Sequence, residues 1–148
     1  MTTKIHPFEQ IKTLVNVHTQ ARAKFKQMRA GIDDPGVREF VPCVATDFEN
    51  DEERFDVSLV GITLRCVLTL DAPSRKGVVT FAHVRRDDVE HPVPLGEVPF
   101  NIRNGYTELH HFTDYADDNV GEPLDLSNPY GMKEVLARYF LQAAGVDA

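Results

Sequence analysis

The sequence predicts an α+β domain in which a mainly antiparallel sheet of five or six strands is bracketed by a long N-terminal helix and a C-terminal helix. Two observations predict this class. Apolar side chains recur every three or four residues near both ends of the chain, as on one face of an amphipathic helix. Over residues 39–111 they alternate with polar side chains, as in strands with one buried face. Parallel strands would need crossover helices between them, and none is predicted.

The N-terminal helix is predicted over residues 7–30. Pro7 suits the first helical turn, and Gly31 is placed to end the helix in a left-handed conformation. Such a helix is about 36 Å long, which is enough to cross a sheet and project beyond it. His18 on the apolar stripe is expected to be a hydrogen-bonded core or interface histidine. The stripe comprises Ile11, Leu14, His18, Ala21, Phe25 and Met28, widened by Phe8 and Val15.

The opposite face of this helix is polar but uncharged. It is expected to face solvent, with a partner surface as the alternative. Its members are Thr13, Asn16, Thr19, Gln20 and Gln27.

The first strands follow a predicted turn at residues 33–36. A strand is expected over residues 39–48, and the acidic stretch 49–53 is expected to form the turn after it. The alternation then changes phase at Gly61, which either a β-bulge or a tight turn would explain. The phase after Gly61 places Leu64 and Leu68 on the core face.

An antiparallel hairpin is predicted over residues 62–86, and prolines restrict the next extended segments to sheet edges or loops. Asn104-Gly105 is a turn signal between short strands expected at 95–102 and 106–111. A long connector is predicted at 112–126. The C-terminal helix, expected over 128–144, would be capped by Ser127 or Asn128 with Pro129 near its first position, and its stripe comprises Met132, Val135, Leu136, Tyr139, Phe140 and Ala143.

Length and charge restrict the function. A chain of 148 residues is expected to form a single domain, residues 1–148. Residues 1–30 carry +5 and the remainder −12, a split that predicts attraction between the first helix and the rest, within one chain or between two. The net charge of −7 argues against a dedicated nucleic-acid binder, since phosphate contacts need an excess of basic residues.

The expected location is cytoplasmic. No apolar run reaches the 18 or so residues of a membrane helix, and no signal-peptide core opens the chain. Cys43 and Cys66 are too few for a disulfide framework, and their apolar neighbours predict unreactive core thiols.

The densest cluster of chemically active side chains lies in the predicted connector. On a helix, His110, Asp114 and Asp117 would share one face, a weak alternative metal site, whereas in a strand His110 and His111 point to opposite faces. No motif of fixed ligand geometry is present, so no metal and no cofactor are predicted. The basic tip Ser74–Gly77 lacks the glycine spacing of a phosphate-binding loop and is interpreted as a solvated hairpin tip.

These observations favour a small binding or regulatory adaptor protein that acts through protein contacts, with self-association as a homodimer. An apolar outward row on the hairpin and the long first helix support the dimer. Whether the protein has any enzymatic activity is left open, leaning towards none. The alternative is a small enzyme or ligand-binding domain with its site near residues 110–128, whose weak candidate residues are His110, His111, Asp114, Arg85 and Arg103.

Overall fold

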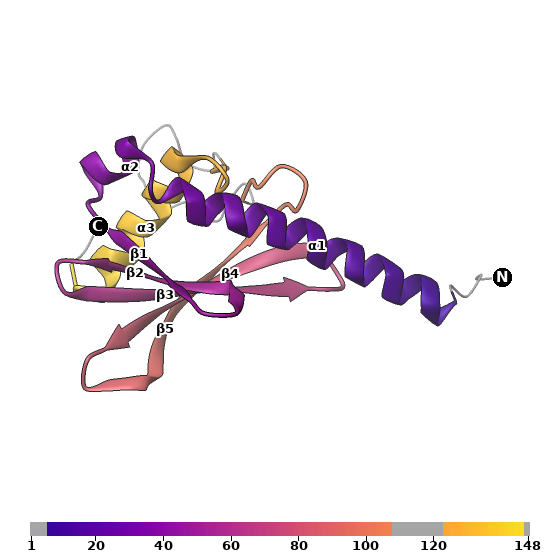
Figure 1. Ribbon diagram of the computed structural model, residues 1–148, viewed down its shortest axis with the longest axis horizontal. Coiled ribbons are helices and arrows are strands. Elements are labelled where there is room, and N and C mark those ends of the chain that lie inside the picture. Colours follow the sequence, from indigo (N-terminus) through magenta and orange to yellow (C-terminus); the bar gives the residue numbers. More distant parts are fainter. Residues whose placement is uncertain (1–5, 108–122, 147–148) are drawn as a thin grey trace.

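The computed structural model describes residues 6–107 and 123–146 and has the predicted α+β class (Figure 1). Its five strands form one antiparallel sheet in which each strand pairs with its neighbour in sequence, in the order β1-β2-β3-β4-β5. The elements in chain order are α1 (Pro7–Gly31), α2 (Pro35–Phe40), β1 (Val44–Phe48), β2 (Asp51–Leu59), β3 (Ile62–Asp71), β4 (Lys76–Arg85), β5 (Asp88–Phe100) and α3 (Pro129–Ala143).

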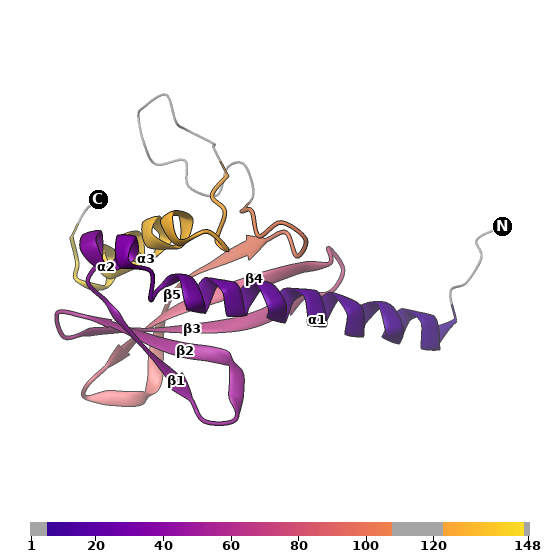
Figure 2. The same ribbon diagram turned by 45° about the horizontal axis from the view of Figure 1, so that its top comes forward.

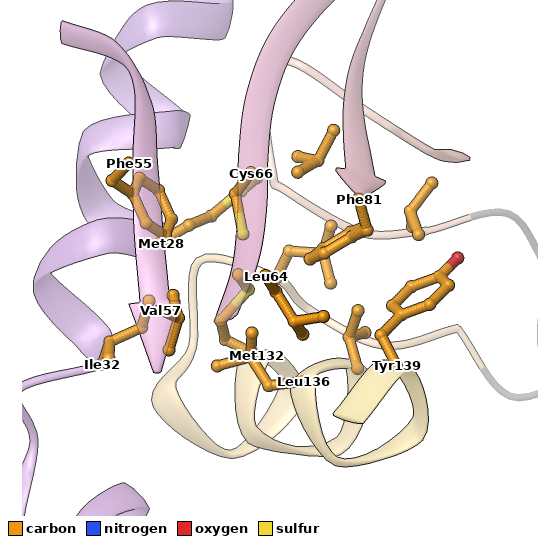
Figure 3. Packing of buried hydrophobic residues seen from close by; sticks show 14 of the residues in the cluster. Met28, Ile32, Phe55, Val57, Leu64, Cys66, Phe81, Met132, Leu136 and Tyr139 are labelled. Carbon is orange, nitrogen blue, oxygen red and sulfur yellow. The ribbon is translucent and has the colours of Figure 1, made fainter. Parts of the chain in front are cut away.

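Both long helices lie on the same face of the sheet (Figure 2). The core therefore forms between this face and the two helices, and Figure 3 shows residues of α1 and α3 meeting the inward side chains of β2, β3 and β4. Phe81 and Tyr139 stack there with ring centroids 4.4 Å apart. Of the two possible arrangements, both helices on one face or one helix on each face, the structure has the first, and no helix of the described residues covers the second face. The sequence could not decide this, because either face of the hairpin offers an apolar row.

Local interactions at its two ends explain where α1 begins and how it continues towards α2. The His6 side chain accepts a hydrogen bond from the backbone N–H of Phe8, and Pro7 occupies the first turn. The prediction for Gly31 is wrong, since Gly31 remains helical and Ile32 follows in a right-handed helical conformation. Gly31 is buried against Pro129, so it permits close approach to α3.

The strand predicted over 39–48 is also wrong in its first half. Asp34 accepts a hydrogen bond from the backbone N–H of Gly36 at 2.8 Å, and Pro35 begins the short helix α2. A capped proline start therefore favours a helix where the sequence pattern suggested a turn and then a strand. Of the predicted strand, only Val44–Phe48 is extended, as β1. The turn that follows is shorter than the predicted 49–53, because β2 already begins at Asp51.

A tight turn explains the phase change at Gly61. Val60 and Gly61 both have positive φ, and Leu59 pairs with Ile62, as in a two-residue hairpin. Leu64 and Leu68 are buried, which confirms the predicted phase of β3, and the 62–86 hairpin is confirmed by the β3–β4 pairing.

The segment after β4 differs from the short strands predicted. β5 is one long edge strand over 88–100, and its prolines are tolerated because it pairs with β4 alone. Past the turn at 101–105, Thr107 makes an isolated bridge to Phe100. The rest of the strand predicted to residue 111, and the predicted connector as far as residue 122, lie outside the described residues.

Both cysteines are buried free thiols. Burial raises the pKa of the Cys43 thiol, and it raises that of Cys66 further, since Cys66 lies fully inside the core. We expect both thiols to react slowly with a thiol-specific reagent such as Ellman's reagent in native buffer, and promptly once urea unfolds the chain. Reaction of either cysteine in native buffer as fast as in urea would contradict this burial.

Candidate interaction site on the first helix

The first half of α1 exposes four large apolar side chains, which we call the projecting stripe. Phe8, Ile11, Leu14 and Val15 are 78%, 62%, 44% and 58% exposed. Their spacing of three and four residues places them along one side of the helix. Scattered exposed apolar residues are ordinary on protein surfaces, but a contiguous row of this size is typical of an interaction site.

The stripe exists because α1 is longer than the sheet it crosses. From residue 17 onwards the helix is anchored in the core through Val17, Ala21, Phe25 and Met28, whereas residues 7–16 extend beyond the sheet (Figure 2). The projection is therefore confirmed. His18 does not lie in the core as the stripe pattern suggested. Its side chain is half-exposed and contacts Glu53 of β2, whereas Val17 is the residue that is buried at this point of the helix.

Ion pairs to the β1–β2 hairpin fix the anchored half. Arg29 Nε lies 2.7 Å from Asp47 Oδ1, Arg22 Nη2 lies 2.5 Å from Glu52 Oε2, and Lys26 Nζ lies 3.1 Å from the same oxygen. The hydrogen bond from Arg29 lowers the pKa of Asp47, and that from Lys26 lowers the pKa of Glu52. Arg22, Lys26 and Arg29 are thus paired with acidic residues of the same chain, so the charge split does not require a second copy.

The structure does not bring the predicted site residues together. His110, His111, Asp114 and Asp117 lie outside the described residues. Arg85 ends β4, whereas Arg103 lies in the turn after β5 and lines the same hollow as Lys76 at the start of β4. Since β4 has ten residues at about 3.3 Å each, roughly 30 Å separates the two arginines along the strand. These two residues therefore cannot serve one small site.

Other site chemistry is sparse in the part of the chain that is described. Residues 6–107 and 123–146 contain no group of three or more His, Cys, Asp or Glu side chains placed to hold a metal ion. The same residues contain no helix long and apolar enough to cross a membrane.

The exposure of the stripe was missed at the sequence level because helical periodicity does not say where the neighbouring sheet ends. The only signal was the length of the predicted helix. Comparison of the chain with protein-family models, curated protein sequences and solved structures found no significant match. The class of protein is therefore defined by fold alone, as an α+β protein with a five-stranded antiparallel meander and two helices on one face.

Proposed function

We propose that this protein is a small binding or regulatory protein that acts through the projecting stripe and forms a homodimer by pairing two stripes. The observation that carries the proposal is the exposure of four large apolar side chains on a helix segment, residues 7–16, in which every residue is exposed. Burying such side chains between two copies removes apolar surface from water, and this is the main driving force of association.

Charge favours a second copy as the occupant of the stripe. Residues 7–16 contain one acid, Glu9, and one base, Lys12, so this segment is neutral although the whole chain carries −7. Two such segments can meet without net repulsion. An antiparallel pairing also places the two acidic bodies at opposite ends of the helix pair, where their mutual repulsion is weakest.

The test compares two valine-to-glutamate variants by light scattering coupled to size exclusion. Val15→Glu introduces a charge into the stripe, whereas Val89→Glu alters a valine of similar exposure in β5. At micromolar protein and moderate salt we expect twice the chain mass of 16.7 kDa for the wild type and Val89→Glu, and a single chain mass for Val15→Glu. A stripe of this size predicts a modest interface, so the dimer should dissociate on dilution.

A wild-type protein that stays monomeric on concentration would contradict the homodimer. A dimer that withstands Val15→Glu but dissociates with Val67→Glu would place the interface on the helix-free face of the sheet instead. Phe25, although a stripe residue in the sequence pattern, cannot report on the interface because it is 1% exposed and a charge there would unfold the core.

A cytoplasmic location is part of this proposal, and it is supported by two free, buried thiols. The alternative of a small enzyme or ligand-binding domain near residues 110–128 remains a prediction, because its histidines and Asp114 lie outside the described residues.

A further inference from the structure

A second surface feature lies between α1 and the two turns at one end of the sheet. It is a hollow of about 340 Å³, within the size range of small-molecule sites. One wall is the uncharged polar face of α1, and the other carries the hairpin tip before β4 and the turn after β5. The lining residues are Thr13, Asn16, Val17, Gln20, Ser74, Arg75, Lys76, Asn101, Ile102 and Arg103.

The hollow gathers positive charge. Three of its described lining residues are basic, namely Arg75, Lys76 and Arg103, and none is acidic, although the chain as a whole carries −7. Within the described parts of the chain neither Arg75 nor Arg103 forms an ion pair, in contrast to Arg22 and Arg29 on the far side of α1. An anion bound in the hollow would neutralise the charges of Arg75 and Arg103, so these two side chains favour a negatively charged ligand there.

Arg75 and Arg103 lie in turns whose backbone has a defined conformation without a ligand. Asn101 accepts hydrogen bonds through its side-chain oxygen from the backbone N–H groups of Arg103 at 2.8 Å and Asn104 at 3.3 Å, which fixes the turn that carries Arg103. Arg75 has φ of 56°, a left-handed conformation that a glycine would adopt without strain. Asn50 and Val60 adopt a similar conformation in the β1–β2 and β2–β3 turns, so the positive φ of Arg75 belongs to the geometry of the β3–β4 turn.

From this arrangement we infer that the hollow binds a small, multiply charged phosphate ester of a polyhydroxylated compound. The guanidinium group of arginine suits phosphate oxygens, because it is planar and donates two parallel hydrogen bonds. The opposite wall offers the hydroxyl of Thr13 and the carboxamides of Asn16 and Gln20, which both donate and accept hydrogen bonds and so match the hydroxyl groups of a polyol. No aromatic ring is among the described lining residues, so the hollow provides no stacking surface for a base.

This inference changes the interpretation of the tip Ser74–Gly77. The sequence indicated a solvated hairpin tip, since the glycine spacing of a phosphate-binding loop is absent. Folding brings α1 and the turn after β5 against the tip, and the site is formed by three segments together. The inference does not depend on the homodimer, because the projecting stripe and the hollow use different residues of α1.

The test is isothermal titration calorimetry with fructose 1,6-bisphosphate as the probe, with inorganic phosphate in a parallel titration and moderate salt throughout. We expect saturable binding of the bisphosphate and weaker binding of inorganic phosphate, which lacks the hydroxyl groups. Arg75→Gln and Arg103→Gln should each weaken bisphosphate binding about tenfold, as expected for loss of a charge-assisted hydrogen bond. Arg85→Gln, at the other end of β4, removes the same charge far from the hollow and should leave affinity within about twofold.

Absence of saturable bisphosphate binding to the wild type would overturn the inference. Equal weakening by Arg85→Gln and Arg103→Gln would also overturn it, because the ligand would then sense only overall charge. Inorganic phosphate binding as tightly as the bisphosphate would refute the polyol part of the ligand class. Circular dichroism of each variant establishes that a loss of binding is not a loss of fold.

Discussion

Replacing Leu64 by alanine is expected to lower the free energy of unfolding by about 2–5 kcal/mol. Leu64 is fully buried in β3, and Figure 3 shows its side chain directed towards Met132 and Leu136 of α3. Truncation removes three side-chain carbons from this contact and leaves a cavity, because sheet and helix are held by their other contacts and cannot fully close the gap. Urea unfolding followed by circular dichroism measures the loss.

The matched control is Val67→Ala on the same strand. Val67 lies half-buried on the helix-free face, so its truncation should cost about 1 kcal/mol or less. All variants are compared at one protein concentration, because a dimer makes apparent stability depend on concentration. Equal losses for the two variants would mean that the helices do not distinguish the two faces of β3.

Gly131→Ala is expected to cost about 3 kcal/mol, although alanine is the better helix former by about 1 kcal/mol. A Cβ atom at residue 131 would lie 2.1 Å from the backbone oxygen of Asp125, far inside van der Waals contact. The obstacle is main chain, so the segment 125–128 would have to move. That movement would disturb the buried Leu126 and the cap at Asn128, whose side chain accepts a hydrogen bond from the backbone N–H of Tyr130 at 2.9 Å.

Glu134→Ala is the control for this variant. It introduces the same residue into the same helix at an exposed position, and we expect a change within about 0.5 kcal/mol. Thermal unfolding of the two variants separates the steric cost from helix propensity. A Gly131→Ala protein as stable as the wild type would show that residues 125–128 shift without cost and that the close approach does not constrain the fold.

The sequence by itself determined the elements whose signals are local. The 3.6-residue period fixed α1 and α3, Asn128 and Pro129 fixed where α3 begins, and the two-residue period fixed which side chains of β3 face inward. These signals act between residues a few positions apart, so they survive without knowledge of the fold. Where two local signals competed, as at residues 35–40, the cap and proline of a helix start outweighed the apparent strand pattern.

Only the tertiary structure decided what lies opposite each surface. Both faces of the hairpin were apolar enough to be covered, and packing placed α1 and α3 on one of them. The exposure of the projecting stripe depends on where the sheet ends, and the hollow depends on the approach of Thr13, Arg75 and Arg103, which are distant in sequence. Such contacts depend on the relative positions of whole elements, and these positions minimise the free energy of the complete core and not of any single segment.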